Sequence, residues 1–82
     1  MDVTDRDTVL RRLAAAEEAV VRARDHVARQ REIVARIESA GHDPALARAL
    51  LARFEAAHAN HDRRLATLLA ELTQCGWKLD GT

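Results

Sequence analysis

Aromatic residues, proline and glycine are scarce in this sequence of 82 residues, which has one Trp, one Phe, no Tyr, one Pro and three Gly. A β-rich fold needs runs of aromatic and β-branched residues, and such runs are missing here. The most abundant residues are Ala, Arg and Leu, all of which are strong helix formers. The composition therefore predicts an all-α protein.

Cysteine and long apolar runs are equally rare. The single cysteine, Cys75, excludes a disulfide within the chain and favours a reducing compartment. The acidic N-terminus lacks the apolar core of a signal peptide, and no apolar run approaches the length that crosses a membrane. We therefore expect a cytoplasmic protein without a membrane partner.

The sequence also lacks an excess of positive or negative charge, and it lacks the common catalytic motifs. Thirteen basic residues balance thirteen acidic ones, so no overall field attracts nucleic acid. No serine or threonine stands beside a histidine and a carboxylate at helical spacing, and there is no glycine-rich phosphate loop. We expect no enzymatic activity, no cofactor and no small-molecule substrate.

The stretch from Ala40 to Pro44 reads as a helix stop followed by a helix start. Gly41 tolerates the left-handed conformation that ends a helix. Asp43 is a good N-cap residue, and Pro44 suits the first helical turn. We expect one hairpin domain over residues 1–82, with helices over 5–40 and 43–75, a turn over 41–43 and a polar tail over 76–82.

Each predicted helix carries apolar residues at steps that alternate between four and three, which is typical of a coiled-coil seam. The first seam is Val9, Leu13, Ala16, Val20, Ala23, Val27, Gln30, Val34 and Ile37. The second seam is Ala47, Leu51, Phe54, His58, His61, Leu65, Leu68, Leu72 and Cys75. Because the turn is short, the two helices must pack antiparallel along these seams.

Charged pairs repeat with the same period on the outer side of the first helix. Glu18 with Arg22, Asp25 with Arg29, and Glu32 with Arg36 each place an acid four residues before a base. Such pairs support the helical register and contribute about 0.2–0.5 kcal/mol each. They indicate a solvated outer face.

A second set of apolar residues lies off the seams: Leu10, Val21, Ile33, Leu46, Leu50 and Leu69. Two helices side by side bury only one stripe each. The second set therefore predicts an interface, and we expect a homodimer in which two hairpins form a four-helix bundle.

Three histidines allow two interpretations. His58 and His61 lie on neighbouring turns of the second helix, and His26 lies roughly opposite on the first. Imidazoles in this arrangement could bind a transition metal such as Zn²⁺, or a haem. Alternatively, the three histidines and Gln30 form a hydrogen-bonded polar layer that sets the register of the bundle. The second interpretation is favoured.

The best candidate for an anion-binding site in this sequence consists of two arginine pairs. The hairpin would bring Arg11 and Arg12 close to Arg63 and Arg64 at its open end. The acidic residues predicted to lie nearby, which offset this charge, are Asp7, Asp62 and Glu71.

Residues 27–34, Gly41 to Asp43, residues 47–54 and His58 resemble a group of small helical-hairpin proteins from alphaproteobacteria. The resemblance covers Val27 to Leu65 and implies a similar hairpin. It also implies that the group's pattern includes Gln30, Gly41, Asp43, Phe54 and His58. It implies no activity. We expect a non-enzymatic interaction or assembly module, such as a small adaptor or regulator, with a metal- or haem-binding bundle as the alternative.

Overall fold

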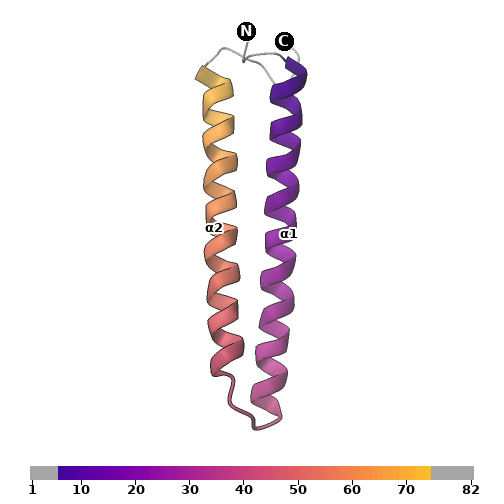
Figure 1. Cartoon of the computed structure of the whole chain (residues 1–82), viewed down its shortest axis with the longest axis vertical. Coiled ribbons are helices and arrows are strands. Elements are labelled where there is room, and N and C mark those ends of the chain that lie inside the picture. The colour runs from indigo at the N-terminus through magenta and orange to yellow at the C-terminus, as the bar shows by residue number, and fades with distance from the viewer. Residues whose placement is uncertain (1–5, 75–82) are drawn as a thin grey trace.

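The computed structural model consists of two long α-helices that lie side by side and antiparallel (Figure 1). The structure describes residues 6–74. Helix α1 spans Arg6–Ser39 and helix α2 spans Ala45–Gln74. The predicted all-α hairpin is confirmed over this range. The predicted limits at residues 5 and 75, and the predicted tail over 76–82, lie outside the described residues.

The end of α1 is set by Gly41, whose φ is 79°. The Gly41 N–H donates to the Glu38 carbonyl and the His42 N–H donates to the Ile37 carbonyl, both at 3.0 Å. These two bonds form a Schellman motif, which satisfies carbonyls that the helix end would leave free. Ala40 already belongs to the turn, so α1 ends one residue earlier than predicted.

The start of α2 is set by Asp43, which lies before the helix rather than inside it. The Ala45 N–H donates to Asp43 Oδ1 at 3.0 Å, and the Arg48 N–H donates to the Pro44 carbonyl at 2.8 Å. Asp43 is thus the N-cap, and its backbone has not yet entered the helix. The predicted start at residue 43 is therefore two residues early.

Replacing Asp43 by Ala removes this cap. We expect Asp43→Ala to lower the free energy of unfolding by about 1 kcal/mol, because one N–H at the start of α2 loses its acceptor. Urea denaturation followed by far-ultraviolet circular dichroism measures the change. Asp43→Asn is the matched control, since its amide oxygen still accepts a hydrogen bond and should retain most of the stability. An equal loss in both variants would show that the cap contributes nothing.

The core is a single layer between the two helices, and it follows the predicted seams. Every predicted seam residue within residues 6–74 is buried or half-buried. The buried members are Leu13, Val20, Ala23, Val27, Gln30, Val34 and Leu72. Most of them belong to α1, whereas the α2 seam residues before Leu72 are half-buried. The seam registers predicted for both helices are confirmed.

This single layer makes the molecule long and thin. The radius of gyration is 17.9 Å, whereas a compact chain of this length would have a value of roughly 12 Å. No side chain in the described part is less than 2% exposed, so the core lacks a fully enclosed centre. Neither α1 nor α2, over the described residues, combines the length and apolar character needed to cross a membrane.

Candidate functional site

One flank of the interhelical seam carries charged residues that pair across the hairpin. Arg31 Nη2 lies 3.2 Å from Glu55 Oε2, and Arg48 pairs with Glu38. Each of these residues directly follows a seam position, so all four lie on the same flank. We call this flank the ion-pair face. Because the side chains are at least 42% exposed, each pair contributes no more than about 1 kcal/mol.

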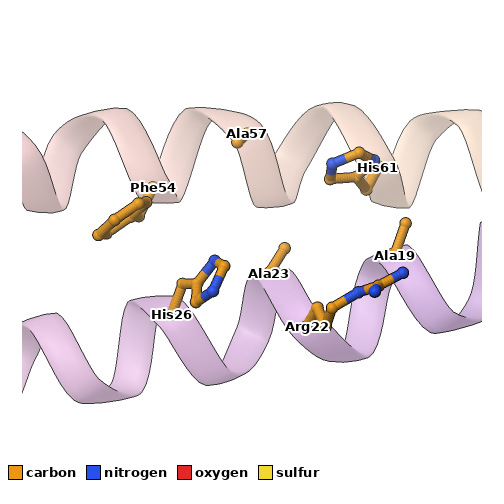
Figure 2. Close-up of a pocket in the computed structure, with 7 residues that line it drawn as sticks. All are labelled: Ala19, Arg22, Ala23, His26, Phe54, Ala57 and His61. Carbon is orange, nitrogen blue, oxygen red and sulfur yellow. The ribbon is translucent and has the colours of Figure 1, made fainter.

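The opposite flank is hollowed and carries small side chains. In Figure 2, His26 and Ala23 of α1 lie across from Phe54, Ala57 and His61 of α2. The hollow between them has a volume of about 280 Å³. Its lining consists of Ala19, Arg22, Ala23, His26, Phe54, Ala57 and His61. Ala19, His26 and Ala57 each directly precede a seam position, which places them opposite the ion-pair face. We call this flank the groove face.

A second hollow continues the first one toward the open end of the hairpin. The two share Ala19 and His61, and the second has a volume of about 1130 Å³. Arg12, Arg63 and Arg64 line it, as does Glu71. The structure therefore brings three of the four predicted arginines to one place. Arg11, Asp7 and Asp62, which were predicted to lie there too, do not belong to its lining.

The exposed large apolar residues of the described part are the same six that the sequence marked as an interface. They do not form one continuous surface. Ile33 and Leu50 each precede a seam position and so lie on the groove face, with Leu46 one turn before Leu50. Leu10 and Leu69 each follow a seam position and so lie on the ion-pair face. Val21, which is 51% exposed, lies on the outer side of α1.

Among the predicted outer pairs of α1, only one is within ion-pair distance in the described residues. Arg22 Nη2 lies 3.9 Å from Glu18 Oε1. The side chains are 70% and 76% exposed, so the pair is well solvated and screened. The outer side of α1 is therefore a solvated face, as predicted.

Gln30 is the one buried polar side chain among residues 7–73, with 5% of its surface exposed. Its Nε2 donates to the carbonyl oxygen of Ala47 at 2.9 Å. A buried amide without a partner would cost roughly 1–3 kcal/mol. This bond joins α1 to the first turns of α2, so it disfavours a shift of one helix along the other.

His26 lies at the edge of the seam rather than within it. The residue is exposed, and its ring lies 5.4 Å from the ring of Phe54 at an interplanar angle of 36°. The predicted polar layer of three histidines and Gln30 is therefore incomplete, because His26 precedes the seam residue Val27 and projects toward the groove face (Figure 2).

His58 and His61 are half-buried, as their seam positions require. His58 Nε2 lies 3.5 Å from Asp62 Oδ2 but forms no hydrogen bond with it, and this buried nitrogen has no other hydrogen-bond partner in the described part of the chain. His61 lines both hollows instead. Within residues 6–74, no group of three or more His, Cys, Asp and Glu side chains is placed to hold a metal. The predicted site of His26, His58 and His61 is thus not assembled in this hairpin.

The difference between the two faces is the feature that sequence reasoning missed. A usable signal was present, because the residues that follow the seam positions Gln30, Ile37, Ala47 and Phe54 are all charged. The residues that precede seam positions include Ala19, Ile33, Leu50 and Ala57, all of them apolar. Comparing the two sets would have predicted a charged face and an apolar face near the turn, whereas toward the open end Arg12 and Arg64 also precede seam positions and Leu69 follows one.

No protein family, curated protein or solved structure matches this chain. The resemblance to small alphaproteobacterial hairpin proteins stays a prediction.

Proposed function

We propose that this chain is a non-enzymatic interaction module, a small cytoplasmic adaptor or regulator, whose hairpins pair as a homodimer with coiled-coil packing. The observation that carries the proposal is the patch of exposed apolar residues near the turn. Ile33, Leu46 and Leu50 are 36%, 87% and 41% exposed. All three lie on the groove face, and we call them the turn patch.

The total exposed surface supports a partner. The chain exposes 6329 Å², whereas a folded monomer of this mass is expected to expose roughly 4,900 Å². The excess, roughly 1,400 Å², exceeds the area of about 800 Å² that each partner contributes to a standard interface. Among the described residues, α1 and α2 bury only the layer between them, which leaves their outer sides exposed.

A second copy is a suitable occupant for the turn patch. Two identical apolar patches related by a twofold axis are self-complementary, which is the usual arrangement in homodimers. Burying Ile33, Leu46 and Leu50 from each hairpin removes three large aliphatic side chains per chain from water. Full burial of a completely exposed side chain of this kind contributes about 1.5–3 kcal/mol, and the gain scales with the exposed fraction, so Leu46 contributes most to association.

Sedimentation velocity tests the proposal. At roughly micromolar concentration, wild type should sediment at twice the monomer mass of 9.1 kDa, and the Leu46→Glu, Leu50→Glu double variant should sediment as a monomer. The charged side chains would face each other across the twofold axis and lose water without gaining a partner. Circular dichroism checks that the variant remains helical.

The matched control is the Leu10→Glu, Leu69→Glu double variant. It makes the same substitutions at residues that are 37% and 36% exposed, but on the ion-pair face. It should remain a dimer. The proposal is wrong if wild type is a folded monomer, or if the control dissociates and the turn-patch variant does not.

A further inference from the structure

We propose that the two hollows of the groove face bind an acidic amphipathic helix of another protein. The site runs from the middle of the hairpin toward its open end, beyond the turn patch. Its floor is made of small side chains, among them Ala15, Ala19 and Ala57. A floor of this kind allows the backbone of a third helix to approach closely, near the lower limit of about 8 Å between helix axes.

The rim of these hollows is strongly basic. Arg12, Arg22, Arg63 and Arg64 line them, and Glu71 is the one acidic residue in their described lining. This charge stands out in a chain whose basic and acidic residues balance overall. Arginine is also well suited to this role, because its guanidinium binds a carboxylate with two parallel hydrogen bonds.

Two of these arginines have no ion-pair partner among the side chains of residues 7–73. Arg22 lies near Glu18, and Arg63 donates to Asn60 Oδ1. Arg12 and Arg64, in contrast, form no ion pair with any residue among 6–74. They come from different helices and line the same hollow. A helix seated on the alanine floor would place its flanking side chains between them.

Charge excludes a second copy from this part of the groove face. If two hairpins docked through these hollows, the basic rim of one chain, with its four arginines and one glutamate, would face the identical rim of the other chain. Like charges at an interface disfavour association. A helix with an apolar stripe and glutamates on both sides of it complements both the floor and the rim.

The inference extends the proposed function to a second partner, but it uses different residues, so either can fail without the other. The probe is a fluorescein-labelled peptide of about 18 residues, which spans about 27 Å as a helix. Its apolar stripe is Leu and Ala, and Glu flanks the stripe. A matched peptide has Lys in place of each Glu. Fluorescence anisotropy with the full chain measures binding.

We expect the acidic peptide to bind and the basic peptide not to bind, with affinity that falls as salt is raised. The Arg12→Glu, Arg64→Glu double variant should bind the acidic peptide at least tenfold more weakly. The control is Arg11→Glu with Arg24→Glu, which changes the net charge equally at exposed arginines that do not line the hollows. It should bind within about threefold of wild type, since distant surface charges are largely screened.

A second variant tests the groove without changing charge. Ala19 lines both hollows, and Ala19→Met would fill the floor where they meet. We expect this variant to lose binding while its circular dichroism spectrum stays helical.

The proposal is overturned if the acidic peptide does not bind, if both arginine variants weaken binding equally, or if a DNA duplex of similar length binds more tightly than the peptide. Measuring the peptide against the Leu46→Glu, Leu50→Glu variant separates this site from the dimer, because binding should persist there.

Discussion

Val20→Asp is expected to unfold the hairpin at room temperature. Val20 is 5% exposed and packs between the two helices, so the new carboxylate would lie in the core without a partner. An uncompensated buried charge costs about 3–5 kcal/mol. Small domains have total stabilities of about 5–15 kcal/mol, and a core of one layer places this chain at or below the low end of that range, so the substitution removes all or nearly all of its stability. Far-ultraviolet circular dichroism should show loss of most helical signal.

The neighbouring residue provides a closely matched control. Val21 is 51% exposed on the outer side of α1, and Val21→Asp makes the same change one position along the same helix. Both substitutions alter helix propensity equally, so their difference reports burial, apart from the repulsion of about 0.2–0.5 kcal/mol that each of Glu17 and Asp25 adds at position 21. We expect Val21→Asp to change stability by no more than about 1 kcal/mol. If the two variants unfold alike, the α1 seam is not where the structure places it.

Gln30→Glu is expected to destabilise the hairpin by about 3 kcal/mol at neutral pH, since it buries a carboxylate. The substitution is nearly isosteric. It replaces the donor that binds the Ala47 carbonyl, at 2.9 Å, with an oxygen that repels it. Burial also favours the neutral acid, so the pKa of the new side chain should lie above its unfolded value of about 4.3.

The sign of the pH dependence follows from this raised pKa. As pH rises, the unfolded state releases the proton first, so the native state binds more protons and stability falls. The loss of stability should begin as pH rises through the pKa that this side chain has in the unfolded state, and it should be complete above the pKa that it has in the folded state. Below both, the variant should recover most of its stability.

Gln30→Leu is the reference for this measurement. Leu fills the same space without a charge, and the Ala47 carbonyl keeps its own helical hydrogen bond within α2. We expect this variant to be at least as stable as wild type, because replacing a buried polar contact by a packed apolar one is often neutral or stabilising. Comparing Glu and Leu variants by urea denaturation at each pH removes the effect of the chain's other carboxylates. A constant difference between them across pH 4 to 8 would contradict the burial of this position.

The sequence by itself determined the features that depend on neighbours within about one helical turn. The seams could be predicted because residues three and four apart share a helix face, whatever that face packs against. The turn could be predicted because Gly41 and Asp43 act on their own backbone and on that of adjacent residues. The helix limits at 40 and 43 were wrong by one and two residues, since a cap residue lies outside the helix that it stabilises.

Only the tertiary structure decided which flank of α1 meets which flank of α2. This arrangement joins residues far apart in the chain, so it follows only once the two seams are paired and the residues on either side of them are compared. It separates Ile33 and Leu50 from Leu10 and Leu69, which the sequence had placed in one interface. It pairs Arg31 with Glu55, brings Arg12 to the same hollow as Arg64, and leaves His26 at the edge of the seam. The candidate binding surfaces are therefore properties of the packed hairpin, whereas the hairpin itself follows from local sequence.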